Sequence, residues 1–113
     1  MKVEISKNSV KNLKISEIAN LDLVNVYLEN IEPGKGRILI ECYGKSWTAY
    51  WGAMSGLTIQ AFFVKADNSY ITDRLDYKAK GRYLKYLTRI VEAVKEALQQ
   101  IDNSKEWLIE AKR

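Results

Sequence analysis

Five basic residues and no acidic residue lie between Tyr77 and Arg89. At about 100° per residue along a helix, four of these cations share one face, and Tyr83 and Tyr86 flank them. A row of cations beside tyrosine rings suits contact with phosphate groups and stacking on bases. The spacing therefore predicts a binding surface for an anionic partner, formed by Lys78, Arg82, Lys85, Arg89 and Tyr86, with Lys80 as the fifth cation nearby.

The same residues also fit the solvent-exposed face of an ordinary amphipathic helix. They lie opposite a stripe of leucine and valine, and Glu92 and Glu96 continue their face. Cations in the first half of a helix oppose its macrodipole, at a cost of roughly a few tenths of a kcal/mol each. Their one-signed charge favours the binding surface, and both interpretations stay open.

A second candidate surface consists of tyrosines on the outer face of the predicted sheet. The expected strand register places Tyr27, Tyr43 and Tyr50 near one another and near Leu39. Exposed tyrosines are frequent anchors at protein interfaces. The alternative is that a helix or the N-terminal segment covers them.

The sequence contains no histidine and one cysteine, Cys42. Histidine is the commonest general base and metal ligand, and zinc or iron–sulfur sites need several such ligands. No loop has the acidic spacing of a calcium site, and no phosphate-binding glycine loop occurs. We therefore expect a binding protein rather than an enzyme, with no catalytic residues, no metal and no cofactor. A lone thiol, here expected in the core, fits a reducing compartment.

The stretch from Arg37 to Met54 must position these candidates. Two runs rich in β-branched and aromatic residues flank Gly44-Lys45, which predicts an antiparallel hairpin closed by that turn. In this register Ile40 lies opposite Ala49. One face of the hairpin is uncharged and belongs to the core, and it carries Ile38, Ile40, Cys42, Trp47, Ala49 and Trp51.

A further strand over residues 23–29 precedes the hairpin. Pro33-Gly34 is typical of a type II turn, and a loop over residues 31–35 pairs Leu28 with Ile38 and Glu29 with Arg37. The alternation in Met1–Ser6 favours a short edge strand. Residues 10–18 are ambiguous, because Leu13 and Ile15 suit a strand while Leu13, Ile15 and Ile18 lack a clean helical period.

Helical spacing governs the rest of the chain. It predicts a helical region over residues 58–75, interrupted near Asp67, and a long helix from Tyr77 to about Gln100. A last helical piece is expected over residues 105–113. The apolar stripe of the long helix consists of Leu84, Leu87, Val91, Val94, Leu98 and Ile101, and a neighbouring face with Ile90, Ala93 and Ala97 is a candidate homodimer contact.

These elements predict a single domain over residues 1–113 with an α+β fold. We expect a three- to four-stranded antiparallel β-meander, packed on one face by a short helix and a long C-terminal helix. The length is enough for one hydrophobic core.

Residues 36–54 read GRILIECYGKSWTAYWGAM, and residues 58–75 read TIQAFFVKADNSYITDRL. These strings resemble small accessory proteins encoded by bacteriophages and prophages, over a region from about Leu21 to Leu75. The most specific features are Cys-Tyr-Gly-x-x-Trp and the following Tyr-Trp-Gly; the C-terminal helix is not part of the resemblance. It implies no catalytic residue or cofactor. It does imply a viral accessory protein in a bacterial host cytoplasm, where such proteins often block host defences.

Three function classes follow from the sequence. The first is a non-enzymatic, phage-type accessory protein, with an anti-defence role as one option, that binds a nucleic acid or a host nucleic-acid–protein complex through the basic helix face. The second is a dimer that sequesters an anionic nucleotide-type ligand, and the third is a structural or assembly protein. The N-terminus lacks the apolar core of a signal peptide and no apolar run approaches membrane-spanning length, so we expect a cytoplasmic protein without a membrane partner.

Overall fold

The computed structural model describes residues 1–5 and 10–102 of the chain. Within them, four strands form one antiparallel sheet in the order β1-β2-β3-β4, and three helices follow. The elements are β1 (Val10–Ile15), β2 (Val24–Glu32), β3 (Lys35–Cys42), β4 (Lys45–Trp51), α1 (Ile59–Lys65), α2 (Asn68–Leu75) and α3 (Gly81–Asp102). The predicted α+β meander with a long C-terminal helix is confirmed.

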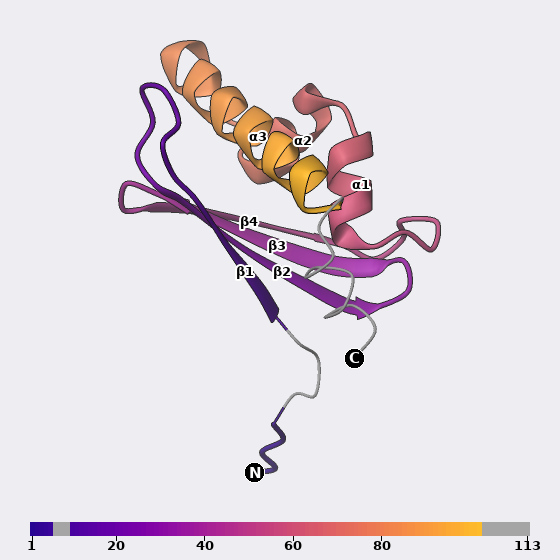
Figure 1. Ribbon diagram of the computed structural model, residues 1–113. Coiled ribbons are helices and arrows are strands. Elements are labelled where there is room, and N and C mark those ends of the chain that lie inside the picture. The colour runs from indigo at the N-terminus through magenta and orange to yellow at the C-terminus, as the bar shows by residue number, and fades with distance from the viewer. Residues whose placement is uncertain (6–9, 103–113) are drawn as a thin grey trace.

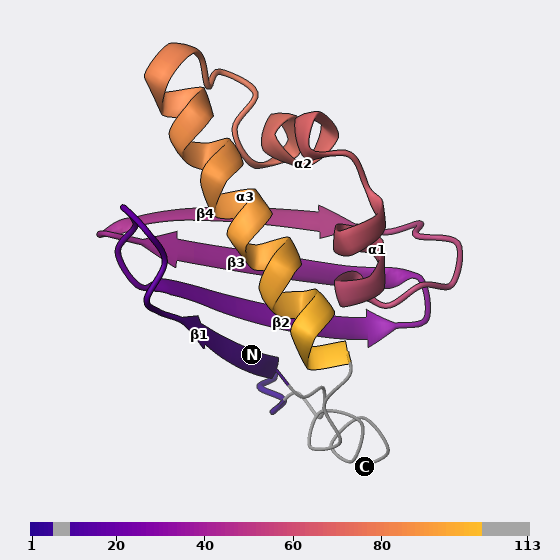
Figure 2. The same cartoon turned by 45° about the horizontal axis from the view of Figure 1, so that its top comes forward.

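All three described helices lie on the same face of the sheet (Figure 1). α3 crosses the strands obliquely, and α2 lies beside it, next to β4 (Figure 2). No helix within the described residues covers the opposite face, which we call the outer face. Because alternate residues of a strand point to opposite faces, each strand gives one set of side chains to the core and one set to the outer face.

The core lies between the inner face of the sheet and the helices. The strands contribute apolar side chains that are almost fully buried, namely Val24, Val26, Leu28, Ile38, Ile40, Cys42, Trp47, Ala49 and Trp51. The helices contribute Ile59, Phe63, Ile71, Leu87, Ile90, Val91, Val94 and Leu98. Full burial of such a side chain stabilises the fold by about 1.5–3 kcal/mol, so this layer supplies the main driving force for folding.

The β2–β3 pairing has the predicted register. Leu28 pairs with Ile38, and Glu29 pairs with Arg37, whose Nε lies 3.3 Å from Glu29 Oε1. The strands join at Pro33-Gly34, where Gly34 has a φ of 81°. An irregularity between Asn30 and Glu32 inserts one extra residue, which keeps the apolar residues of both strands on the inner face.

The β3–β4 hairpin has the predicted faces, but the predicted register is wrong. Ile40 pairs with Trp47 rather than with Ala49. The turn is Tyr43-Gly44 instead of Gly44-Lys45, and its two residues have φ values of 50° and 78°. Positive φ at both central positions is what a type I′ turn requires, and this turn matches the strand twist. Each partner moves by two positions, so the alternation of faces is unchanged.

α1 and α2 divide residues 58–75 as predicted, with the break after Lys65 and a restart at Asn68. The start of α1 is held by Thr58 Oγ1, which accepts a hydrogen bond from the Ala61 N–H at 3.2 Å. Asn30 of β2 accepts a second one from the Ile59 N–H at 2.8 Å. These two acceptors satisfy helix N–H groups that have no partner within the helix.

α3 begins at Gly81, later than the predicted start at Tyr77. Gly81 has a φ of 59°, outside the right-handed helical region, so the helix cannot run continuously from residue 77. Leu84 is 36% exposed and is less buried than the rest of the predicted stripe. The helical piece predicted over residues 105–113 lies outside the described residues.

The first strand lies elsewhere than predicted. Residues 1–5 form no strand, and the edge position is taken by β1, which pairs with β2 from Val10 to Ile15. Residue 6 lies outside the described residues. β1 settles the ambiguity of residues 10–18 in favour of a strand, with Leu13 and Ile15 half-buried on the inner face.

Two tryptophans of β4 connect the sheet to the helices. Trp47 and Trp51 are each 5% exposed, so each buried indole N–H needs an acceptor. The Trp47 Nε1 donates to the hydroxyl of Tyr83 in α3, and the Trp51 Nε1 donates to the hydroxyl of Tyr70 in α2, both at 2.8 Å. The predicted core location of both tryptophans is confirmed.

We expect Trp51→Ala to lower the free energy of unfolding by about 3–5 kcal/mol, because it leaves a cavity among Phe62, Tyr70 and the core. Chemical denaturation monitored by circular dichroism measures this change. Tyr50→Ala, on the outer face of the same strand, is the matched control and should cost less than about 1 kcal/mol. Equal losses for the two variants would contradict the assignment of the core face.

Candidate functional site

Tyr83 attaches the β3–β4 hairpin to the first half of α3. Its hydroxyl accepts from Trp47 at 2.8 Å and donates to the Asp76 carboxylate at 2.9 Å. Lys45 Nζ lies 4.9 Å from the centre of the Tyr83 ring, within the range of a cation–π contact. Asp76 also accepts from the backbone N–H of Lys78 at 3.0 Å. One tyrosine therefore joins β4, α3 and the connection between α2 and α3.

Tyr86 forms a second attachment between α3 and the hairpin. Its hydroxyl donates to Cys42 Sγ at 3.4 Å, and its ring lies 6.4 Å from that of Trp47. Burial raises the pKa of Tyr86 to about 12 and also raises the pKa of Tyr83. Both tyrosines flank the cations in sequence as predicted, but in space they face the sheet. Tyr86 is half-buried and its hydroxyl is already engaged.

Exposed cations surround this attachment. We define the basic surface as Lys45, Lys78, Lys80, Arg82 and Lys85, all of them exposed. In the described part of the chain, none of the five forms an ion pair with a carboxylate. Three acids lie near the same end of the molecule: Asp76, which is hydrogen-bonded to Tyr83; Asp22, whose charge contributes to the raised pKa of Tyr86; and the exposed Glu41, which pairs with Ser46 beside Lys45. The basic surface therefore keeps an excess of positive charge.

The structure does not bring the four predicted cations onto one helical face. Arg82, Lys85 and Arg89 share a face of α3, as their spacing indicates. Lys78 instead precedes the helix, because α3 begins only at Gly81, and its Nζ lies 5.6 Å from the centre of the Tyr77 ring. Arg89 is half-buried and turns toward a pocket.

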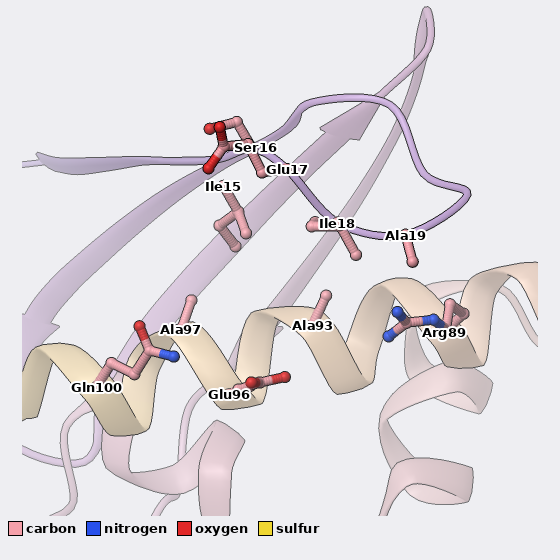
Figure 3. A pocket seen from close by; sticks show the side chains of 10 residues that line it. All are labelled: Ile15, Ser16, Glu17, Ile18, Ala19, Arg89, Ala93, Glu96, Ala97 and Gln100. Atoms are coloured by element: carbon pink, nitrogen blue, oxygen red, sulfur yellow. The ribbon is translucent and has the colours of Figure 1, made fainter.

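That pocket has a volume of about 350 Å³ and separates α3 from the connection between β1 and β2. Ile15 and Ile18 point from the sheet side toward Ala93 and Ala97 of the helix (Figure 3). Its charged residues are Arg89, Glu17 and Glu96. Two carboxylates against one guanidinium do not favour an anionic nucleotide, so this pocket gives no support to the nucleotide-sequestering alternative.

The helix face suggested for a homodimer is already occupied within the chain. Ile90 is fully buried and Ala93 is 4% exposed, while Ala97 lines the pocket. The contacts expected between two copies are therefore made within one copy, between α3 and the sheet. The sequence pattern could not separate these cases, because both need small apolar residues on the helix.

The second candidate surface is partly assembled. On the outer face Tyr27 pairs with Leu39, and both are half-buried, while Tyr50 is 46% exposed and pairs with Arg37. Arg37 also lies 5.8 Å from the centre of the Tyr50 ring. Tyr43 does not join this face, because it is the first residue of the turn at the end of the hairpin. It lies two residues before Lys45 of the basic surface instead.

Sequence reasoning missed two residues of this region, Lys45 and Tyr77. The sequence predicts Lys45 inside the turn, whereas its contact with Tyr83 depends on the observed register of the hairpin. Tyr77 is 74% exposed and stacks against Lys78. The sequence does contain a signal for Tyr77 as a binding residue, because this aromatic residue directly precedes the cluster of cations.

A comparison with known proteins identifies a family for the chain. Residues 3–84, well over half of the sequence, match a family described as a phage family. The chain belongs to this phage family. The match confirms the resemblance found over residues 21–75 and extends it to all four strands, α1, α2 and the beginning of α3. No curated protein and no solved structure matches the chain.

The part shared with the phage family includes four of the five residues of the basic surface and ends just before Lys85. Within residues 1–5 and 10–102, no three potential metal-ligating side chains come together. In the same residues, none of the helices has the length and apolar character needed to cross a bilayer.

The raised pKa of Tyr86 leads to a pH prediction. A group whose pKa is higher in the folded state than in the unfolded state stabilises the fold below the unfolded value, near 10, and loses this contribution as the pH rises through about 12. We expect the free energy of unfolding to fall between pH 10 and pH 12, and to fall less in Tyr86→Phe. Urea denaturation at several pH values measures the difference. An equal fall in wild type and Tyr86→Phe, with Tyr50→Phe as the control, would contradict this assignment.

Proposed function

We propose that this phage-family protein binds nucleic acid through the basic surface, as a non-enzymatic accessory protein. The observation that carries the proposal is that five exposed cations gather at one end of the fold without a carboxylate partner in the described chain. Phosphate groups of a nucleic acid backbone are spaced densely enough to engage several such cations together.

The folded protein gives less support than the sequence does to the alternative interpretation, an ordinary solvent-exposed helix face. On such faces acids usually lie three or four residues from the bases and pair with them. Here the acids of α3 begin only at Glu92, beyond the basic half of the helix. Lys45 adds a cation from β4, so the positive charge extends beyond a single helix.

A rigid support underlies the basic surface. Tyr83 and Tyr86 hold the hairpin against α3 through Trp47, Asp76 and Cys42. A backbone-binding surface benefits from such support, because less conformational freedom is lost when the ligand binds. The cationic side chains themselves remain exposed and can adjust to the phosphates.

A role in binding rather than catalysis agrees with the side chains available. The chain has no histidine, and Cys42 is buried with its thiol in contact with Tyr86. Membership of a phage family fits an accessory role during infection, such as covering a nucleic acid against a host defence. This context supports the proposal but does not select the sequence that is bound.

Binding should depend strongly on salt. With about four phosphate contacts, affinity should fall roughly 50-fold for a single strand and roughly 150-fold for a duplex between 50 and 200 mM salt. Fluorescence anisotropy with labelled DNA and RNA oligonucleotides measures this slope. Absence of binding to all of them at 50 mM salt would refute the proposal and would direct the search to a host protein instead.

Charge reversal tests the basic surface itself. We expect Lys78→Glu, Arg82→Glu and Lys85→Glu together to abolish binding, while the melting temperature shifts by less than about 3 °C because all three side chains are exposed. The matched control reverses Lys2, Lys14 and Lys65, which are exposed and lie outside the basic surface. Both variants have the same net charge, so an equal loss in both would show a general charge effect and would contradict a defined site.

A further inference from the structure

Tyr43 occupies a backbone conformation that tyrosine rarely adopts. Its φ is 50°, in the left-handed region that favours glycine and, among other residues, asparagine and aspartate. The following residue, Gly44, has a φ of 78° and completes the type I′ turn. Asparagine followed by glycine is the preferred pair for such a turn. Tyrosine at this position therefore lowers the stability of the hairpin.

Packing does not compensate for this cost. The Tyr43 side chain is 80% exposed, one of the most exposed large side chains in the described chain, and none of the described contacts involves its ring. An exposed aromatic residue at a strained backbone position points to a role outside the folding of the protein.

The position of Tyr43 suggests what that role is. The residues around it are tied to α3, since Cys42 contacts Tyr86 and Lys45 contacts Tyr83. These two tyrosines belong to the same helical turns as Arg82 and Lys85. Tyr43 is therefore held at the border of the basic surface.

Tyr77 provides a second exposed ring at the same end of the molecule. It is 74% exposed and follows Asp76, which is anchored to Tyr83 at 2.9 Å. Its ring contacts the Lys78 cation. An exposed ring and a cation therefore lie close in sequence at two places, Tyr43 with Lys45 and Tyr77 with Lys78. Tyr83 connects the two places, because it contacts Lys45 and Asp76.

We propose that Tyr43 and Tyr77 are stacking platforms for unpaired bases, so that the ligand of the basic surface is a single-stranded nucleic acid. This inference rests on the proposed function and specifies its ligand. In a duplex the faces of the bases are stacked on one another and cannot reach these rings. In a single strand the bases stack on aromatic side chains while cations follow the phosphates. Such binding tolerates different sequences, because every base has an aromatic face.

The test compares Tyr43→Asn with wild type, using a fluorescein-labelled oligothymidylate of about 15 nucleotides and a duplex of the same length. We expect Tyr43→Asn to weaken single-strand binding about 5- to 100-fold. Its salt dependence should stay unchanged, because the phosphate contacts remain. Duplex binding should change less than about twofold. Tyr43→Phe keeps the aromatic face and should bind like wild type.

The same substitution should stabilise the protein. Asparagine fits the turn better than tyrosine, so Tyr43→Asn should raise the melting temperature by about 2–6 °C. Loss of binding in a more stable protein cannot result from unfolding. Tyr77→Ala should also weaken single-strand binding about 5- to 100-fold, whereas Tyr50→Thr on the outer face should leave it unchanged.

The outcomes separate this inference from the function on which it rests. Unchanged single-strand binding in both Tyr43→Asn and Tyr77→Ala would overturn the stacking inference, while salt-dependent binding lost on charge reversal would leave the proposed function standing. Preference of wild type for the duplex would also overturn the inference. If wild type binds no nucleic acid, both fail together.

Discussion

The structure depends on the burial of two indole rings on one strand. Trp47 and Trp51 lie on the inner face of β4, and a buried indole N–H without an acceptor would cost about 1–3 kcal/mol. Both indole N–H groups find their acceptors on the helices rather than within the sheet. Tyr83 and Tyr70 supply the acceptors from α3 and α2. These two hydrogen bonds help to fix where each helix lies over the sheet.

The candidate site is a consequence of this arrangement. Once Tyr83 reaches Trp47, the first half of α3 must lie over the end of the β3–β4 hairpin. The cations on the other side of that helical half then point to solvent, and Lys45 joins them from the hairpin. Tyrosines therefore serve in two ways here. Tyr83 and Tyr86 build the support, and Tyr43 and Tyr77 are exposed at its edge.

Much of the fold could be predicted because successive side chains of a strand alternate between the two faces of the sheet. The inner and outer faces of β2, β3 and β4 follow from the pattern alone, and a shift of the hairpin by two positions does not change them. The register itself could not be predicted, because it depends on the sign of φ at Tyr43 and Gly44. A tyrosine at the first position of a type I′ turn contradicts the usual preference, so local rules placed the turn one residue too late.

Four of the five cations of the site could be predicted, but Lys45 and the roles of the tyrosines could not. Charge clustering is visible in the sequence, whereas the direction of a tyrosine on a helix depends on where the helix packs. Tyr83 lies four residues before Leu87, and Tyr86 lies four residues before Ile90, which is a signal for the buried side. The lysine and arginine residues next to these tyrosines in the sequence suggested an exposed binding surface instead. Tyrosine has an apolar ring and a polar tip, so both interpretations were compatible with it.

The measurement that tests the central claim most directly is amide chemical-shift mapping of the isotope-labelled protein during titration with a single-stranded oligonucleotide. We predict salt-sensitive shifts confined to residues 43–45 and 77–85, which contain the basic surface and its two exposed rings. Shifts centred on Tyr27 and Tyr50 of the outer face, or no shifts at low salt, would contradict the assignment of the basic surface as the binding site.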